Sequence, residues 1–380
     1  MKITIIGTAY PYRGGGIATY NERLAQVFQE EGHEVKIHTF TLQYPNIIFP
    51  GKSQYSDEPA THNLNIERSI NSINPFNWLK VGRRIRKERP DLIIVKFWLP
   101  FMGPVLGTIL RLIKKNKHTK VITIIDNMIP HESRFGDRSF TKYFVKPVDA
   151  FVTMSQNVLD DVDKFDTVKP RVLTPHPLYD NFGARTSRED ALQKLGLDTT
   201  KKYILFFGFI RDYKGLDLLI KAFAEDTINR DEIKLIIAGE YYSDKEKYLK
   251  LISEYNLEKD IIQKDDFIPN SEVADYFNAC DLVVQPYKSA TQSGVTQIAY
   301  HFHKPMIVTD VGGLSEMCPD GKVGYVVKPE PKAIAKGIVR YFEHTDIDAM
   351  QDTIIVEKKK YEWNILTGKI YNLYKELGGK

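Results

Sequence analysis

Short apolar runs alternate with amphipathic segments along the whole chain, and this alternation predicts an α/β protein. Residues 2–7 are mostly apolar, as is typical of parallel strands that are covered on both faces. Residues 20–32 have a helical period and end at a glycine, and a second apolar run follows at residues 34–40. A strand, a loop, a helix and another strand in this order indicate a Rossmann-like unit with a parallel sheet.

The alternation continues to about residue 175. Residues 41–75 are rich in Pro, Asn and Ser, so we predict an irregular insertion there. Residues 183–195 are charged and lack a strong core pattern, which places a domain boundary near residues 180–200. Further helices are predicted at residues 77–89 and 105–114, and further strands at residues 91–97, 120–125, 150–155 and 171–173.

The second half of the chain repeats the plan of the first. Asn270 or Ser271 is the expected cap of a short helix in this half. Strands are predicted at residues 203–207, 233–239, 261–267, 282–285 and 305–309. Helices are predicted at residues 216–223, 244–255 and 270–277, from about residue 293, and at residues 362–377.

Two cations, Arg211 and Lys214, stand in the turn between the strand at residues 203–207 and its helix. The start of a helix is the positive end of its dipole, so the cations gain no stability from this position. An anion bound between them and the helix amides explains them, and a diphosphate is the obvious candidate. The alternative is a surface turn with two solvated charges.

The segment of residues 289–302 has apolar residues at the spacing of one helical face, which predicts a helix from about Ser293 and Gly294. Gln297 is then expected on another face, near the first turn. The amides of Gly294, Val295 and Thr296 suit phosphate or sugar oxygens. The alternative is that Ser293 serves only as the cap of the helix.

The loop at residues 8–19 contains three consecutive glycines, Gly14, Gly15 and Gly16, which let the backbone approach a ligand closely. They do not form the G-x-G-x-x-G pattern, and the second strand ends in His38 and Thr39 rather than in an acid that holds a ribose. A nicotinamide or flavin site is therefore disfavoured. A flexible turn that binds nothing is the other reading.

Polar residues also follow the strand at residues 120–125. Asp126 and Asn127 come directly after it, and His131 lies a few positions further on. Ligands of α/β sheets bind just beyond the carboxyl ends of parallel strands, so these residues are candidates for substrate contact. For His131 a structural hydrogen bond is an equal alternative.

The composition is that of a soluble globular protein with two domains. Its two cysteines cannot form a disulfide framework, the first residues resemble no signal peptide, and no apolar run is long enough to span a membrane. We therefore expect a cytoplasmic protein.

Positive charge gathers in the first half of the chain, where residues 1–175 carry 25 Lys and Arg against 17 Asp and Glu. One cluster lies at residues 80–89 and another at residues 111–120, each beside apolar or aromatic residues. Such clusters suit the anionic inner surface of a membrane, and solvated helix faces are an equal alternative. No compact module that binds nucleic acid is visible.

Five short motifs, in order along nearly the whole chain, resemble the retaining GT-B glycosyltransferases of family four, also called group one. They are Arg13-Gly14-Gly15-Gly16, Lys214-Gly215, Ala238-Gly239-Glu240, Lys304-Pro305 followed by Gly312-Gly313-Leu314-Ser315-Glu316, and a C-terminal helix with Trp363. The resemblance implies two Rossmann-like domains whose parallel sheets face a central cleft. The resemblance also implies an acceptor domain of residues 1–182 together with the returning C-terminal helix at 360–380. The nucleotide-sugar donor domain would then comprise residues 183–359.

The residues and the resemblance together give an expected site. Arg211 and Lys214 stabilise the diphosphate, Asp126 and His131 orient the acceptor or the donor sugar, and the base is read by backbone near Ile268. Glu316 either contacts the sugar or balances a helix dipole. Donor binding is expected at Gly14, Gly15, Gly16, Glu240, Ile268, Ser289, Gln292, Ser293, Gly294, Val295, Thr296, Gln297 and Glu316.

The chain departs from the family pattern at three places. The family commonly has two glutamates eight positions apart, and aligning on Lys304-Pro305 puts Ser289 and Gln297 at those positions. Phe209 follows the strand glycine where an arginine is usual, so Arg211 takes that role. Asp126 replaces the acceptor-side histidine of the first domain. These departures leave the sugar and the acceptor open, and point to a variant subfamily or to lost activity.

The resemblance implies transfer of a hexose from a UDP- or GDP-sugar to a hydroxyl of a glycan or lipid-linked acceptor, with retention, in synthesis of a cell-surface polysaccharide. The departing phosphate receives the acceptor proton in such enzymes. No D-x-D motif lies between two hydrophobic segments, so neither a metal nor a cofactor is expected. A non-catalytic nucleotide-sugar binding subunit and a GT-B epimerase or hydrolase are the alternatives, and an NAD-dependent enzyme is the least favoured.

Overall fold

The computed structural model describes residues 1–13, 16–45, 53–56, 58–60, 63–129, 136–242, 244–290 and 293–379. The chain divides into two compact units. The first comprises Met1–Pro175 and Trp363–Lys380, and the second comprises His176–Glu362. The first unit therefore contains the last helix of the chain, and the divisions lie seven and three residues from the boundaries expected after residues 182 and 359.

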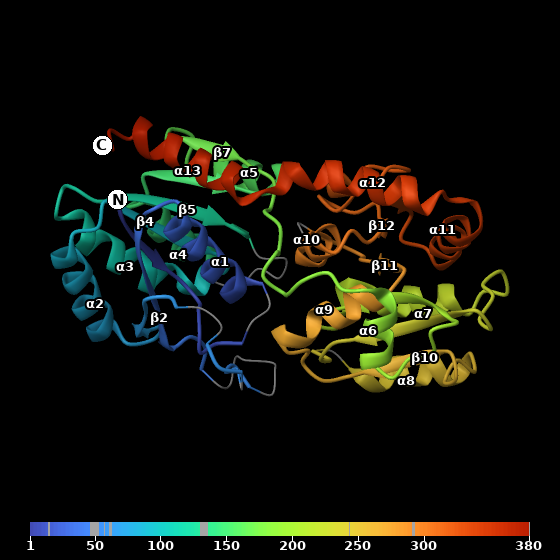
Figure 1. Cartoon of the computed structure of the whole chain (residues 1–380). Coiled ribbons are helices and arrows are strands. Elements are labelled where there is room, and N and C mark those ends of the chain that lie inside the picture. Colours follow the sequence, from blue (N-terminus) through green and yellow to red (C-terminus); the bar gives the residue numbers. More distant parts are fainter. Residues whose placement is uncertain are drawn as a thin grey trace. The chain divides into compact units, whose positions relative to one another are not determined.

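The first unit contains a parallel sheet of seven strands in the order β3-β2-β1-β4-β5-β6-β7 (Figure 1). Its strands are β1 (Lys2–Ile6), β2 (Glu34–Leu42), β3 (Ile66–Asn71), β4 (Leu92–Phe97), β5 (Lys120–Ile125), β6 (Ala150–Thr153) and β7 (Arg171–Leu173). Its helices are α1 (Ile17–Glu30), α2 (Pro75–Glu88), α3 (Gly103–Lys114), α4 (Asp137–Val145), α5 (Gln156–Asp163) and α13 (Trp363–Glu376).

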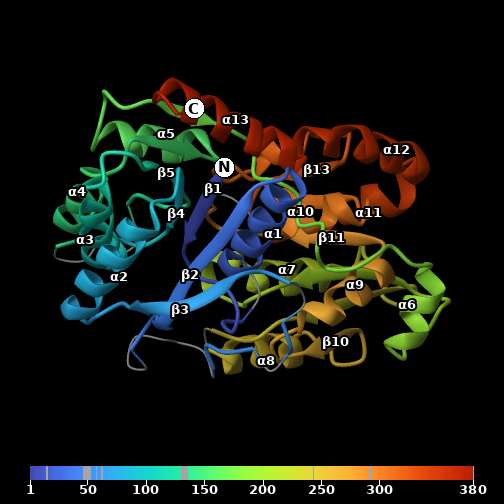
Figure 2. The same cartoon turned by 60° about the vertical axis from the view of Figure 1, so that its left-hand side comes forward.

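Helices cover both faces of this sheet because its central strands are apolar on both sides. All residues of β4 are buried, and α2, α3 and α4 contribute to one core with them. The connection from β1 to β2 is a right-handed crossover in the other direction, so its helix α1 lies over the opposite face of the sheet. Helix α13 packs on α1, with the rings of Tyr20 and Trp363 5.2 Å apart. Figure 2 shows α13 beside α5 and α1.

The second unit contains a parallel sheet of six strands in the order β10-β9-β8-β11-β12-β13. Its strands are β8 (Lys202–Phe207), β9 (Ile233–Ala238), β10 (Ile261–Lys264), β11 (Leu282–Gln285), β12 (Met306–Thr309) and β13 (Gly324–Val327). Its helices are α6 (Arg188–Lys194), α7 (Leu216–Phe223), α8 (Lys245–Glu254), α9 (Asn270–Ala279), α10 (Gly294–His301), α11 (Pro331–His344) and α12 (Ile347–Glu357).

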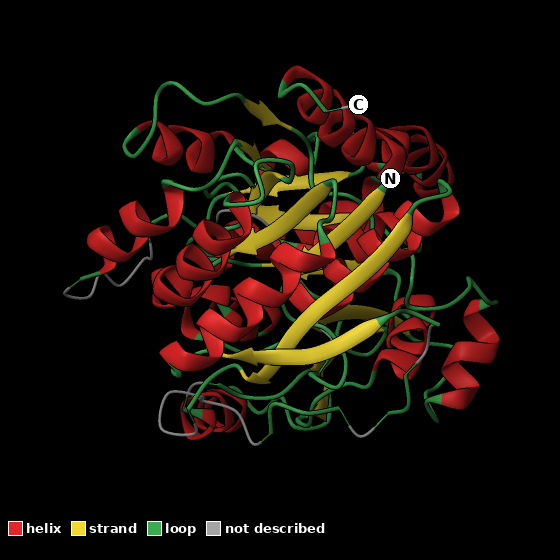
Figure 3. Ribbon diagram, turned by 90° about the vertical axis from the view of Figure 1, so that its left-hand side faces the viewer, coloured by secondary structure: helices red, strands yellow, loops and turns green. Residues whose placement is uncertain are grey.

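Helices α7, α8 and α11 share one core with the second sheet. Helices α9 and α10 follow from crossovers in the other direction and therefore lie over its opposite face. Figure 3, in which the strands of the first unit lie toward the viewer, shows that sheet flanked by helices in the same way. In both sheets all paired strands are parallel, so the loops after the strands meet at one edge.

The structure contains elements that the hydrophobic pattern did not predict. The insertion expected at residues 41–75 includes β3, which pairs with β2 through a register irregularity. Helices α4, α5, α6, α11 and α12 and strand β13 were also not predicted. The expected cap of α9 is wrong, because Pro269 occupies the cap position and no side chain caps the helix.

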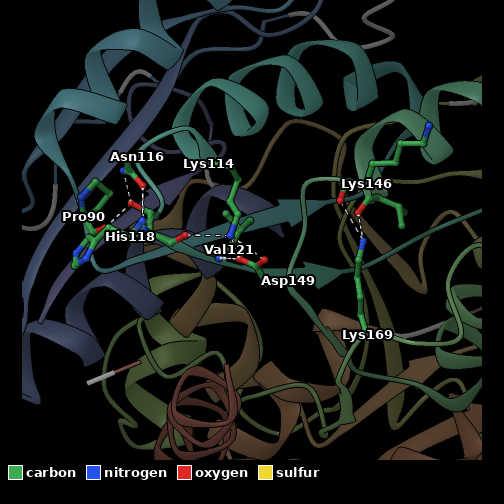
Figure 4. A network of polar contacts seen from close by, with 10 residues as sticks. Pro90, Lys114, Asn116, His118, Val121, Lys146, Asp149 and Lys169 are labelled. Atoms are coloured by element: carbon green, nitrogen blue, oxygen red, sulfur yellow. Dashed lines mark hydrogen bonds and ion pairs between the residues drawn. The ribbon is translucent and has the colours of Figure 1, made fainter. Parts of the chain in front are cut away.

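Polar groups at the N-terminal edge of the first sheet are paired with one another. Figure 4 shows Lys114, whose Nζ donates to both oxygens of Asp149 at 2.8 and 2.6 Å. Asp149 also accepts a hydrogen bond from the backbone N–H of Val121 at 2.8 Å. Close by, the Thr119 hydroxyl donates to the Pro90 carbonyl at 2.6 Å. This edge is held together by satisfied contacts, which indicates a structural role.

We expect Asp149→Ala to lower the free energy of unfolding by about 2 kcal/mol, because both the Val121 N–H and the Lys114 ammonium lose the carboxylate that accepts their hydrogen bonds. Chemical denaturation monitored by circular dichroism measures the change. Glu254→Ala is the control: its pair with Lys250 is well exposed, so the loss should stay below about 0.5 kcal/mol. Equal effects of the two substitutions would contradict this role for Asp149.

Candidate functional site

Arg211 and Lys214 lie in the turn after β8, at the carboxyl edge of the second sheet. Arg211 is exposed and Lys214 is partly buried. Neither side chain has a carboxylate partner within the described residues. Burial lowers the pKa of Lys214 to about 8, and the positive charge of Arg211 acts in the same direction. Two neighbouring cations without a counter-charge form a site that an anion would stabilise.

Two glycines allow this turn to pack closely against the rest of the edge. Gly215 has φ +68°, and a Cβ there would lie 1.9 Å from the Pro286 carbonyl oxygen. A Cβ at Gly208 would lie 3.0 Å from Lys214 Nζ and 3.8 Å from a methyl carbon of Val295. Lys214 and the first turn of α10 therefore both lie next to Gly208. The structure brings together two features that were predicted separately.

The start of α10 is organised by Gln285, the last residue of β11. Its Oε1 accepts hydrogen bonds from Ser293 Oγ at 2.6 Å and from Thr296 Oγ1 at 3.1 Å. Ser293 occupies the cap position, but its hydroxyl makes no cap hydrogen bond to the helix. The helix thus begins at Gly294 without a side-chain cap, which leaves its first amides suited to ligand oxygens.

Gln297 differs from its prediction, because its side chain is fully buried rather than on an open face of α10. Its Nε2 lies 3.6 Å from Met317 Sδ, and its Oε1 is buried without a hydrogen-bond partner in the described structure. Glu316 and Ser289 are both exposed, near the same edge of the sheet. Gly312 carries Glu316's loop past Ala290, since a Cβ at Gly312 would lie 1.7 Å from the Ala290 carbonyl oxygen.

Three partly exposed aromatic rings at this edge form a cluster that the sequence analysis did not predict. Phe209 lies 4.5 Å from Tyr242 and 6.0 Å from Phe267 between ring centroids, with its ring inclined by 32° and 29° to theirs. The Arg211 guanidinium lies 5.3 Å from the centre of the Tyr242 ring. Phe209 occupies the position where an arginine was expected, and this departure was the signal in the sequence that could have pointed to the aromatic cluster. Beside this cluster, the side chains of Glu240 and Ile268 are buried.

The first unit places Asp126 directly after β5. Its Oδ1 lies 3.1 Å from the ammonium of Lys96, a residue of β4 that the sequence analysis did not select. Gly16 adopts φ +72° at the start of α1, which has no side-chain cap. Gly14, Gly15, His131 and Gln292 lie outside the described residues.

One group in the first unit has the composition of a metal site. His38, Glu67 and Glu88 place their donor atoms within 4.8 Å of one another. Lys36 Nζ already lies 3.0 Å from an oxygen of each glutamate, and Arg84 pairs with both as well. Burial lowers the pKa of His38 to about 4, with the charge of Lys36 acting in the same direction. The cations already balance this group, so it functions as a structural network.

We expect the affinity for UDP to weaken about tenfold between pH 7 and pH 9. A pKa of about 8 means that free Lys214 is mostly protonated at pH 7 and mostly neutral at pH 9. Only the charged form attracts the diphosphate, whose own ionisation is complete above about pH 7. Calorimetric titration measures the change. Lys214→Arg should flatten the dependence, because arginine stays charged; an unchanged slope in this variant would assign the titration to another group.

Comparison with known proteins shows which family has this arrangement. The model of glycosyl transferases group 1 matches residues 187–358, and the model of glycosyltransferase family 4 matches residues 14–194. An uncharacterized glycosyltransferase of Methanocaldococcus jannaschii is 24% identical, with 99% of each chain covered. TuaC of Bacillus subtilis, provisionally assigned to teichuronic acid biosynthesis, is 24% identical, with 91% of this chain and 90% of TuaC covered.

Solved structures show the same fold. HepE from Anabaena, determined in complex with UDP and glucose, superposes with a TM-score of 0.74 at 15% identity, covering 99% of this chain and all of HepE. The two family models meet in the middle of the chain and together account for most of its length. The chain therefore belongs to the family-four, or group-one, glycosyltransferases and has their two-unit GT-B fold.

Proposed function

We propose that this glycosyltransferase moves a hexose from a UDP- or GDP-sugar to a hydroxyl of a glycan or lipid-linked acceptor, with retention at the anomeric carbon. The observation that carries the proposal is the pair Arg211 and Lys214. Both cations lack a counter-charge within the described residues, and Lys214 lies beside the uncapped start of α10. The diphosphate of a nucleotide sugar supplies two negative groups to this position.

The same groups account for catalysis of bond cleavage. When the glycosidic bond breaks, negative charge grows on the departing diphosphate, and Arg211, Lys214 and the amides of Gly294, Val295 and Thr296 stabilise that charge. The departing phosphate takes the acceptor proton, so the proposal requires no general base. It also requires no metal, because the cations and the helix start neutralise the leaving group.

The second unit supports binding of the rest of the donor. The Phe209, Tyr242 and Phe267 cluster offers a flat apolar surface for a nucleobase, next to the backbone at Ile268. Glu316 is exposed and accepts hydrogen bonds from sugar hydroxyls in this proposal. We also assign Ser289, Gln292, Glu240 and Gln297 to donor binding. UDP is the first nucleotide to test, since HepE was determined with UDP and glucose.

In the first unit, the loop with Gly14, Gly15 and Gly16 lies before α1, and we assign it to the donor phosphates and the acceptor. Asp126 and His131 orient the acceptor or the sugar. The relation to TuaC supports a role in the synthesis of a cell-surface polysaccharide. A non-catalytic binding subunit is the second candidate, because Gln297 replaces a family glutamate and is fully buried.

Helix α2 supports a membrane-proximal acceptor. Phe76 at its start is 83% exposed, and Ile73 just before it is 51% exposed. Lys80, Arg83 and Lys87 follow Phe76 at the spacing of one helical face, and none of them forms an ion pair within the described residues. An apolar tip beside a basic face matches an anionic lipid surface. Every helix in the described part of the chain is too short or too polar to cross a bilayer.

A thermal-shift and hydrolysis screen tests the donor site. UDP-, GDP- and ADP-sugars are added to the wild-type protein and to Lys214→Ala, and one nucleotide series should raise the melting temperature of the wild type alone. Hydrolysis or transfer by Lys214→Ala should fall about 10²- to 10³-fold, because one contact to the leaving group is lost. Stabilisation without any sugar release, even with acceptors present, would favour the binding subunit.

Vesicle binding tests the basic face of α2. We expect the triple variant Lys80→Glu, Arg83→Glu, Lys87→Glu to bind phosphatidylglycerol vesicles about a hundredfold more weakly than the wild type, at roughly 1 kcal/mol for each cation removed. Phosphatidylcholine vesicles should bind neither protein well. The matched control is charge reversal at the exposed Lys322, Lys332 and Lys336 of the second unit. Equal losses in both variants would reject α2 as the membrane surface.

A further inference from the structure

A lysine lies inside an otherwise apolar central strand of the first sheet. Lys96 is the fifth residue of β4, which is buried along its whole length, and its side chain is only 3% exposed. Burying an ammonium costs free energy that a hydrophobic residue at this position would not require. The position therefore calls for an explanation beyond packing.

Two groups surround the Lys96 ammonium. Asp126 Oδ1 lies 3.1 Å from it, and the centre of the Tyr20 ring lies 3.2 Å from it. Tyr20 belongs to α1, is itself fully buried, and contacts Met154 and Trp363 with its hydroxyl and ring. The ammonium is thus fixed from two sides, by a carboxylate and by the face of an aromatic ring.

Asp126 is held at only one of its two oxygens. Lys96 contacts Oδ1, and Oδ2 has no partner within the described residues, while the side chain as a whole is 25% exposed. The residue follows β5, and its backbone N–H donates to the Phe97 carbonyl at the end of β4 at 2.9 Å. The open oxygen therefore lies at the carboxyl edge of the parallel strands, where α/β folds bind ligands.

We propose that Lys96 is a positioning residue of the transfer site, which holds Asp126 as a fixed carboxylate so that its open oxygen accepts a hydrogen bond from a sugar hydroxyl. This inference rests on the proposed glycosyltransferase function. A carboxylate that is already bound at one oxygen and cannot rotate loses little entropy when a hydroxyl donates to the other. The hydroxyl belongs either to the donor sugar or to the acceptor.

The charges around the pair support this role. Burial raises the pKa of Asp126, and Lys96 opposes the rise; burial lowers the pKa of Lys96, and Asp126 opposes that change. Among the described residues no other ionisable group contributes to either shift, and from α1 the pair is faced by the Tyr20 ring. Without the lysine, burial alone acts on Asp126, and its carboxyl becomes protonated at a higher pH.

The test measures the pH profiles of UDP-glucose hydrolysis and of transfer to an acceptor hydroxyl for the wild type, Lys96→Met, Lys96→Arg and Asp126→Asn; the reaction that needs the hydroxyl bound by Asp126 shows the effects. If another nucleotide sugar is the donor found in the screen, that compound is used. Lys96→Met should reduce kcat/KM at pH 7 at least tenfold and recover part of the loss at higher pH, where Asp126 ionises again. Asp126→Asn should lose activity at all pH values. Lys96→Arg should keep most of the activity that Lys96→Met loses.

Two binding measurements separate the possible sources of the hydroxyl. If the donor sugar provides it, Asp126→Asn weakens binding of UDP-glucose but not of UDP. If the acceptor provides it, both affinities stay within twofold of the wild type, and the loss appears only in transfer to an acceptor. Unchanged pH profiles of both hydrolysis and transfer in Lys96→Met, with a wild type that binds and turns over the donor, would overturn the inference. A wild type that binds no nucleotide would instead overturn the proposed function.

Lys96→Met leaves a buried carboxylate without its cation and is therefore the variant most exposed to misfolding. The double variant Lys96→Met with Asp126→Asn removes both charges and keeps the side-chain volumes close to the original. It should fold, and its rate should equal that of Asp126→Asn alone, because Lys96 acts through Asp126. A double variant that is folded by circular dichroism yet more than tenfold slower than Asp126→Asn would show that Lys96 acts by another route.

Discussion

The proposed donor site depends on a cation without a counter-charge among the described residues. Lys214 is partly desolvated at the carboxyl edge of the second sheet, and Arg211 adds a second positive charge beside it. Because neither has a carboxylate partner within the described residues, the turn after β8 carries an electrostatic cost that an anion removes. Gly208, Gly215 and the start of α10 pack around this turn, so the same packing that desolvates Lys214 also brings the start of α10 close to it.

The first sheet shows how unusual such a position is. At its N-terminal edge, Lys114, Asp149 and the Val121 amide satisfy one another, and this edge serves the fold. At its carboxyl edge, the Asp126 carboxylate keeps one oxygen without a partner in the described structure. Incompletely paired charge thus lies at the carboxyl edge of each sheet, which is where parallel α/β sheets bind ligands.

The sequence predicted the central strands and most helices of both sheets because their apolar periodicity is strong. It missed β3 and β13, since an edge strand needs no continuous apolar run. It also missed α4, α5, α6, α11 and α12. For α11 a signal was available, because Ile334, Ile338 and Tyr341 recur at helical spacing and are buried. The sequence located helix ends less accurately. At α9, Pro269 occupies the cap position that was expected for Asn270 or Ser271.

Arg211 and Lys214 could be proposed as site residues from the sequence because two cations at a helix start have no structural reason to be there. The same logic applied to the lone lysine in the apolar segment of β4 could have found Lys96, but its partner Asp126 is 30 positions away and pairing depends on the strand order. The burial of Gln297 could not be read from helical periodicity, because the contact that buries it comes from Met317 in another segment.

The chain is a glycosyltransferase of family four, and we propose that its second unit neutralises a diphosphate and that its first presents a fixed carboxylate to a sugar. The most direct test of the central claim compares the affinities of UDP, UMP and uridine by calorimetry at pH 7. Because Arg211 and Lys214 contact the diphosphate in this proposal, we expect UDP to bind at least about a hundredfold more tightly than uridine. Lys214→Ala should remove most of this difference. Equal affinities for the three compounds in the wild-type protein would contradict a diphosphate site at Arg211 and Lys214.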